Sequence, residues 1–125
     1  MIVAIGVDQA EIARIRGLYE RSGDRFVERV FTKDEAAYCR TRSNPAESLA
    51  ARFAAKEAVM KCLGTGWTEG LAFRQIEVQR VPSGDTRLVV TGTALERANA
   101  LGIRRWHVSL THTNENATAF VIAES

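Results

Sequence analysis

The spacing of hydrophobic positions changes near Gly66. Between residue 10 and Gly66, apolar residues recur every three to four positions, as on one face of a helix. Beyond Gly66 they alternate with polar residues, which is typical of half-exposed strands. Residues 2–7 fit neither pattern, because they are apolar without interruption, as in a central strand buried on both faces. We therefore expect an α+β fold with N-terminal helices and one long central helix packed on a small, mostly antiparallel sheet that includes residues 2–7.

Capping and turn signals give the expected bounds of the other elements. The expected helices cover residues 10–20, 25–29, 32–40 and 47–66, with a last helix from 93 to a stop at Gly102. Capping boxes are expected at Thr32–Glu35 and Thr93–Glu96. The later strands are expected at 75–79, 87–90, 106–110 and 117–123, the first two forming a hairpin through the turn at 82–85.

The central helix, ESLAARFAAKEAVMKCLGTG, carries two charges in an unusual place. Ser43 or Asn44 is expected to cap it, and Gly64 and Gly66 to end it. At about 100° per residue, Glu57 lies among apolar positions and Lys61 about 40° from it. One interpretation is a buried Glu57–Lys61 ion pair. The other is a site for a metal ion or a phosphate.

Two further polar positions stand at the ends of expected strands. Asp8 follows the first strand, where it is either the cap of the next helix or a side chain facing a crevice. His112 follows a later strand beside Thr113, where it is either a strand-end hydrogen-bonding group or a ligand-binding group.

Composition excludes several classes of protein. The 125 residues are enough for one domain, 1–125, and a net charge of +2 is too small to indicate nucleic-acid binding. No window is long enough to span a membrane, and no signal peptide is visible. Cys39 and Cys62 make neither a disulfide framework nor a metal-binding pair, so a reducing, cytoplasmic location is expected. Arginines crowd the first third of the chain among acidic residues, mostly as a solvated surface and in part as an acceptor for an acidic partner.

Four segments together carry a family resemblance: IGVD at 5–8, ARFAAKEAVMKCLGTG at 51–66, the hairpin, and SLTHT at 109–113. In this order they resemble the holo-acyl-carrier-protein synthases, small 4'-phosphopantetheinyl transferases of fatty acid synthesis. The similarity runs from residue 1 to about 123. It implies transfer of the phosphopantetheine arm of coenzyme A to a serine of an acyl carrier protein, with release of adenosine 3',5'-bisphosphate. It also implies a homotrimer with sites between neighbouring chains.

The resemblance also assigns roles to single residues. Asp8 and Glu57 would hold Mg²⁺, and Lys61 would complete the catalytic set. Coenzyme A would be bound by the following residues: Arg52, Lys61, Gly64, His112 and Thr113. The acidic helix of the carrier protein would meet Arg14 and Arg21. Family members commonly have glycine where this chain has Ala51.

The chemistry of these residue types agrees with that assignment. Two carboxylates without a histidine–cysteine set favour Mg²⁺ over zinc. Phosphoryl transfer depends mainly on positioning and charge neutralisation, for which Lys61 is suitable. Two alternatives remain: a non-catalytic module that docks acidic carrier proteins, and a structural α+β domain with a buried ion pair. A docking module has no use for the paired carboxylates, which separates it from a transferase.

Overall fold

The computed structural model describes residues 1–64 and 70–125. Over these ranges the helices are α1 (Ile12–Ser22), α2 (Asp24–Val30), α3 (Lys33–Arg40), α4 (Pro45–Leu63), α5 (Gly92–Ala100) and the short 3₁₀ helix η1 (Phe73–Gln75). The strands are β1 (Ile2–Glu11), β2 (Ile76–Arg80), β3 (Thr86–Val90), β4 (Arg105–His112) and β5 (Asn116–Glu124). The expected α+β class is confirmed. The expected stop at Gly66 lies outside the described residues.

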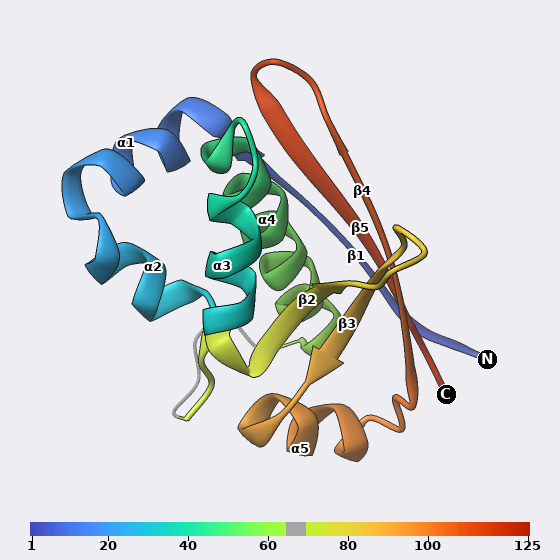
Figure 1. The fold of residues 1–125 in the computed structure, drawn as a ribbon. Helices are drawn as coiled ribbons and strands as arrows, with labels where there is room; N and C mark the ends of the chain where they lie inside the picture. The colour runs from blue at the N-terminus through green and yellow to red at the C-terminus, as the bar shows by residue number, and fades with distance from the viewer. Residues whose placement is uncertain (65–69) are drawn as a thin grey trace.

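The central helix α4 separates two layers (Figure 1). On one side is an antiparallel sheet in the order β1-β5-β4, and on the other are α1 to α3. The hairpin β2-β3 forms a separate two-stranded sheet, so the single sheet suggested by the sequence is wrong in this detail. Both chain ends lie together at one end of the long sheet, where Ser125 N–H donates to Met1 O (2.9 Å).

Helix α4 and strand β1 approach each other very closely. A Cβ atom added at Gly6 would lie 2.2 Å from the carbonyl oxygen of Ala58. The residues that the sheet and helix place in this contact are also small, and Ala54, Ala58 and Ala119 are fully buried. Small side chains therefore allow the strand backbone to lie almost directly on the helix.

The local capping predictions are mostly confirmed. The Asn44 side chain accepts from Glu47 N–H (3.4 Å), and Gly64 ends α4 in the left-handed conformation (φ 69°). The box at Thr32–Glu35 is present with both hydrogen bonds. The box expected at Thr93–Glu96 is wrong, because α5 begins after Thr91 without a side-chain cap bond.

Strand β1 differs from the expectation in length and burial. It runs to Glu11, so Asp8 lies inside the strand opposite Ala119 and does not cap α1. It is also an edge strand, and its outward side chains, including Ile5 (58%) and Val7 (51%), are exposed. The prediction of a central strand buried on both faces is therefore wrong, because nothing in the described chain covers the outer face of the long sheet.

The interpretation of Glu57 and Lys61 as a buried ion pair is wrong, because Lys61 pairs with Asp8 and neither Glu57 nor Lys61 is fully buried. Glu57 is half-buried and the Lys61 side chain is 55% exposed, whereas Lys56 and Glu35 form a pair with both side chains completely buried. The helical wheel failed here because layers pack on both sides of α4, so burial does not follow a single stripe.

Within residues 1–64 and 70–125, no helix combines the length and the apolar character needed to cross a bilayer.

Candidate functional site

The first group of predicted residues converges where β1 passes α4. Lys61 Nζ lies 2.9 Å from Asp8 Oδ1 and also donates to the carbonyl oxygen of Val7 (2.9 Å). Glu57 lies one helical turn before Lys61 and within electrostatic reach of Asp8. Residues 53 positions apart in the chain thus form one cluster of two carboxylates and one ammonium.

The surroundings of Glu57 disfavour its negative charge. Burial is the largest cause that raises the pKa of the Glu57 carboxyl, and the charge of Asp8 raises it further. The cations Lys61 and Arg14 act in the opposite direction without cancelling the effect. A carboxylate with too few neighbouring positive charges is suited to accept a cation.

The donor atoms of this cluster fit a hard cation better than a soft one. Asp8 and Glu57 offer only oxygen, and no cluster of three or more His, Cys, Asp or Glu side chains suited to a metal occurs in the described parts of the chain. Such a set cannot form a closed zinc site. It does fit Mg²⁺, which commonly takes one or two carboxylates and completes its shell with water and substrate oxygens.

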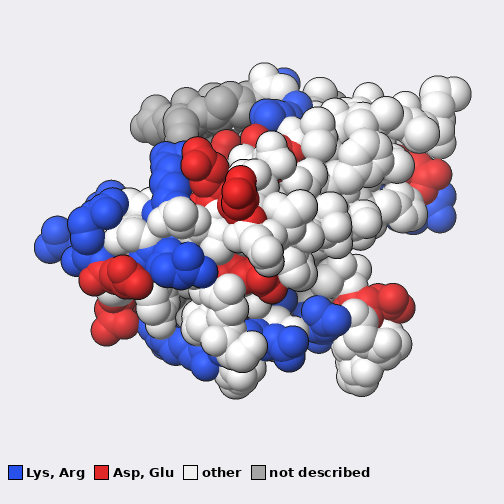
Figure 2. Space-filling view, turned by 90° about the horizontal axis from the view of Figure 1, so that it is seen from above, with Lys and Arg blue, Asp and Glu red and all other residues white. Residues whose placement is uncertain are grey.

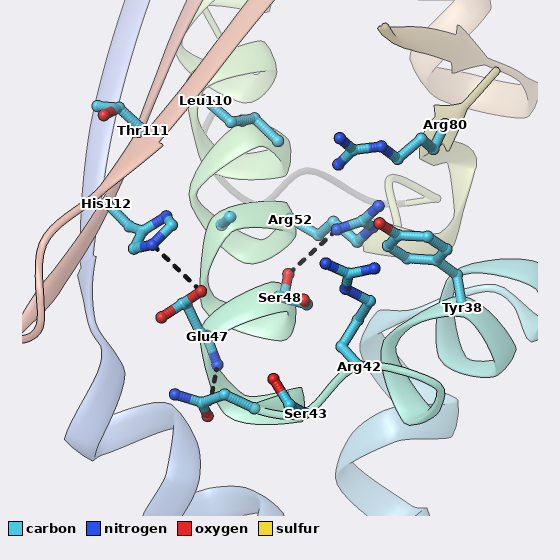
Figure 3. A pocket seen from close by; sticks show the side chains of 12 residues that line it. Tyr38, Arg42, Ser43, Glu47, Ser48, Arg52, Arg80, Leu110, Thr111 and His112 are labelled. Atoms are coloured by element: carbon cyan, nitrogen blue, oxygen red, sulfur yellow. Dashed lines mark hydrogen bonds and ion pairs between the residues drawn. The ribbon is translucent and has the colours of Figure 1, made fainter. Parts of the chain in front are cut away.

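A cavity of about 350 Å³ opens along the N-terminal half of α4 (Figure 3). The residues around it come from α3 and the loop after it, from α4, and from the ends of β2 and β4. Those with charged or aromatic side chains are Tyr38, Arg42, Glu47, Arg52, Arg80 and His112. Asp8, Glu57 and Lys61 are not among the residues that line it.

Three guanidinium groups surround the ring of Tyr38 in this cavity. The guanidinium carbon of Arg52 lies 4.5 Å from the ring centroid, that of Arg42 5.6 Å and that of Arg80 6.0 Å (Figure 3). We call Tyr38, Arg42, Arg52 and Arg80 the arginine pocket. The ring face attracts each cation, but the cations repel one another.

Arg52 is the least satisfied member of the arginine pocket. It is 4% exposed, its only side-chain hydrogen bond among the described residues is a long one to Ser48 O (3.4 Å), and its Nε has no partner there. Buried arginines are normally paired with anions, so the arrangement indicates a site for an anionic ligand.

His112 faces Arg52 from the opposite wall of the cavity. Its Nε2 lies 3.2 Å from Glu47 Oε1 in the first turn of α4. The histidine is the last residue of β4 and points inward with Leu110, whereas Thr111 points away. The prediction that Arg52 and His112 belong to one site is therefore consistent with the geometry.

The remaining predicted residues lie elsewhere. Thr113 uses its hydroxyl in the β4–β5 turn, accepting from Glu115 and Asn116 N–H, and it does not line the cavity. Gly64 stands at the exposed end of α4, three residues beyond Lys61. Arg14 and Arg21 are exposed on α1.

Sequence reasoning missed three members of the arginine pocket: Tyr38, Arg42 and Arg80. They lie 14, 10 and 28 positions from Arg52, on three different segments. In the sequence, Arg42 belonged to an arginine-rich stretch and Arg80 directly followed the half-exposed strand expected at 75–79, so both resembled ordinary solvated cations. No local pattern showed that packing would bring them to one ring.

Comparison with known families agrees with the resemblance of the four segments. The 4'-phosphopantetheinyl transferase superfamily matches residues 4–121. A holo-[acyl-carrier-protein] synthase of Koribacter versatilis is 45% identical over 124 residues, which cover 99% of each chain.

Solved structures give the same result for the fold. The holo-[acyl-carrier-protein] synthase of Neisseria meningitidis superposes with a TM-score of 0.88 at 33% identity, covering 100% of both chains. The corresponding Bacillus anthracis enzyme, in complex with coenzyme A (3',5'-ADP), gives a TM-score of 0.81 at 35% identity and covers 100% of this chain and 98% of its own.

Proposed function

Because this chain belongs to the 4'-phosphopantetheinyl transferase superfamily, and within it to the holo-[acyl-carrier-protein] synthases, we propose how its residues perform that transfer. The donor is coenzyme A, and the acceptor is a serine hydroxyl of an apo acyl carrier protein in fatty acid synthesis. The reaction is Mg²⁺-dependent and releases adenosine 3',5'-bisphosphate. The observation that carries the proposal is the convergence of Asp8, Glu57 and Lys61 on one point of α4.

Asp8 and Glu57 would hold the Mg²⁺ ion, which when bound neutralises charge on the coenzyme A pyrophosphate. The support is the oxygen-only donor set and the raised pKa of Glu57. Lys61 adds a second positive charge beside the pyrophosphate, with the backbone near Gly64 next to it. Glu57 is our candidate for the base that accepts the proton of the serine hydroxyl as its oxygen attacks phosphorus.

The arginine pocket would take the phosphorylated nucleotide end of coenzyme A. Its support is the buried Arg52, whose Nε has no partner in the described chain, together with His112 on the facing wall. Guanidinium groups bind phosphate oxygens through charge-assisted hydrogen bonds, and the ring of Tyr38 holds them in place. Thr113 would contribute from the neighbouring turn.

Two features support a homotrimer with sites between neighbouring chains. In the described parts of the chain, Asp8 and Glu57 do not line the cavity that holds the arginine pocket, so we infer that the two ends of one coenzyme A molecule would be held by different subunits. In addition, Ile5, Val7 and Phe120 expose apolar surface on the outer face of the long sheet. A second and a third copy of the chain would cover that face.

The carrier protein would dock at α1 through Arg14 and Arg21. Lys and Arg side chains crowd the α1–α2 end of the molecule in Figure 2, with acidic side chains between them, whereas the opposite half of that face is mostly uncharged. Carrier proteins present an acidic helix, so attraction between opposite charges would guide the encounter.

Incubation with coenzyme A, Mg²⁺ and an apo carrier protein tests the proposal directly. Mass spectrometry of the carrier protein should show the added phosphopantetheine arm, and chelation of Mg²⁺ should prevent the addition. An unmodified carrier protein that is nevertheless retained by this chain would refute the transferase and favour a docking module.

A further inference from the structure

One ion pair is sealed in the interior behind the arginine pocket. Lys56 Nζ lies 2.7 Å from Glu35 Oε1, and both side chains are 0% exposed. The ammonium also donates to the carbonyl oxygens of Phe73 (3.1 Å) and Ile76. All three protons of the ammonium therefore have acceptors, which is the condition under which a buried charge is tolerated.

The carboxylate of Glu35 is equally well satisfied. Its Oε1 accepts from Thr32 N–H (3.0 Å) and its Oε2 from Val78 N–H (2.8 Å). The first of these bonds belongs to the capping box that starts α3, and the second holds strand β2. A single pair of charges thus joins α3, α4, η1 and β2.

Residues of the arginine pocket lie on the same elements as the ion pair and are close to its members in the sequence. Tyr38 follows the carboxylate by three residues on α3, and Arg52 precedes the ammonium by one turn on α4. Arg80 is two residues beyond Val78 on β2, and alternate residues of a strand share a face. The ion pair therefore links the three elements that bring the ring and two of its arginines together.

Repulsion between the arginines of the pocket favours separation of these elements. Three guanidinium groups lie 4.5 to 6.0 Å from one ring centroid, and their mutual repulsion opposes that arrangement. Attraction to the ring face acts against that repulsion. Strong, directional contacts behind the pocket add to this attraction and favour the observed spacing of the three elements.

We propose that Lys56 and Glu35 are positioning residues for coenzyme A: they hold α3, α4 and β2 at the spacing that the arginine pocket requires. The proposal rests on the function proposed above for that pocket. Neither residue contacts the ligand, so their effect is on the fraction of molecules in which the pocket is ready to bind. If that fraction falls to about one tenth, the apparent Kd rises about tenfold.

The test separates positioning from stability by removing both charges at once. The double variant Glu35→Gln with Lys56→Met leaves no unpaired buried charge, and such replacements often preserve stability. We expect its Kd for adenosine 3',5'-bisphosphate, measured by calorimetry, to rise about tenfold or more. The KM for coenzyme A should rise in parallel, with kcat within about threefold of wild type, because the Asp8–Glu57 cluster is not part of the network.

A matched control shows whether stability alone changes the affinity. Ile103 is buried next to β4 and outside the arginine pocket, so Ile103→Ala should lower the unfolding midpoint in urea without changing the Kd. A second double variant, Glu35→Met with Lys56→Met, also removes both buried charges and serves if the first does not fold; its Kd should rise in the same direction. Either double variant, folded and with the wild-type Kd and KM, would overturn the inference. Failure of the wild-type protein to bind the nucleotide would instead contradict the proposed function.

Discussion

The contact between Gly6 and α4 gives the sharpest prediction about stability. In Gly6→Ala the new methyl carbon would start 2.2 Å from Ala58 O and 3.0 Å from Cys62 Sγ. An unstrained carbon–oxygen contact needs about 3.3 Å, so β1 and α4 must separate by about 1 Å. The obstacle is helix backbone, which cannot rotate away as a flexible side chain can.

We expect this change to cost about 3 kcal/mol, the upper end of the range for overpacked cores. For a domain of this size, that corresponds to a loss of about 10–15 °C in Tm. Asp8 lies two residues further along the same face of β1, so its separation from Glu57 would change as well. A displacement of about 1 Å in a catalytic group can lower the rate about 100-fold.

Urea unfolding followed by circular dichroism measures the stability, and the carrier-protein assay measures the rate. Gly17→Ala on α1 is the matched control, because its methyl group meets only the mobile end of Arg21 (2.9 Å). That variant should gain up to about 1 kcal/mol from helix propensity. If Gly6→Ala were as stable as Gly17→Ala, the close backbone contact could not exist as described.

Further predictions concern the site, the outer sheet face and the cysteines. Glu57→Gln should lower the transfer rate about 100-fold or more with the fold intact, and near-normal turnover would refute the proposed role of Glu57. Because the pKa of Glu57 is raised in the folded protein, its ionised carboxyl opposes folding at neutral pH, so the variant's midpoint of unfolding in urea should rise. Arg52→Met should weaken binding of adenosine 3',5'-bisphosphate about 10- to 100-fold in calorimetry without loss of stability, because it removes a buried cation whose Nε has no partner in the described chain. Unchanged binding would exclude the pocket. Phe120→Ser should reduce the mass measured by light scattering to that of a monomer, whereas an unaltered oligomer would place the interface elsewhere. Burial raises the pKa of the Cys39 thiol from 9.0 to about 11 and also raises that of Cys62, so a thiol reagent at pH 8 should label both only after unfolding; rapid labelling of the native protein would contradict their burial.

Local chemistry made much of this fold predictable. The bounds of α4 depend on a cap at Asn44 and a left-handed glycine at Gly64, and both hydrogen bonds close within four residues. The box at Thr32–Glu35 and the hairpin are equally local. The pairing of Asp8 with Glu57 was implied by the family resemblance; the structure places them within electrostatic reach, and their role as metal ligands stays a prediction.

Burial could not be predicted in the same way, because it depends on what packs against each element. The uninterrupted apolar residues of β1 suggested a central strand, but the strand lies at an edge with Ile5 and Val7 exposed. Lys56 and Lys61 both lie on α4, and from the sequence either lysine could have paired with a carboxylate in the interior. Only Lys56 is buried, because β2 and α3 cover its side of the helix.

The sequence by itself thus determined the order and type of most helices and strands and several of their caps, and its family resemblance implied two carboxylates for one cation. Tertiary structure alone decided that Tyr38, Arg42, Arg52 and Arg80 meet in one cavity and that a Lys56–Glu35 pair lies behind them. The physical reason is range: capping and turn hydrogen bonds join neighbours in the chain, whereas charges from separate segments meet only after the layers have packed.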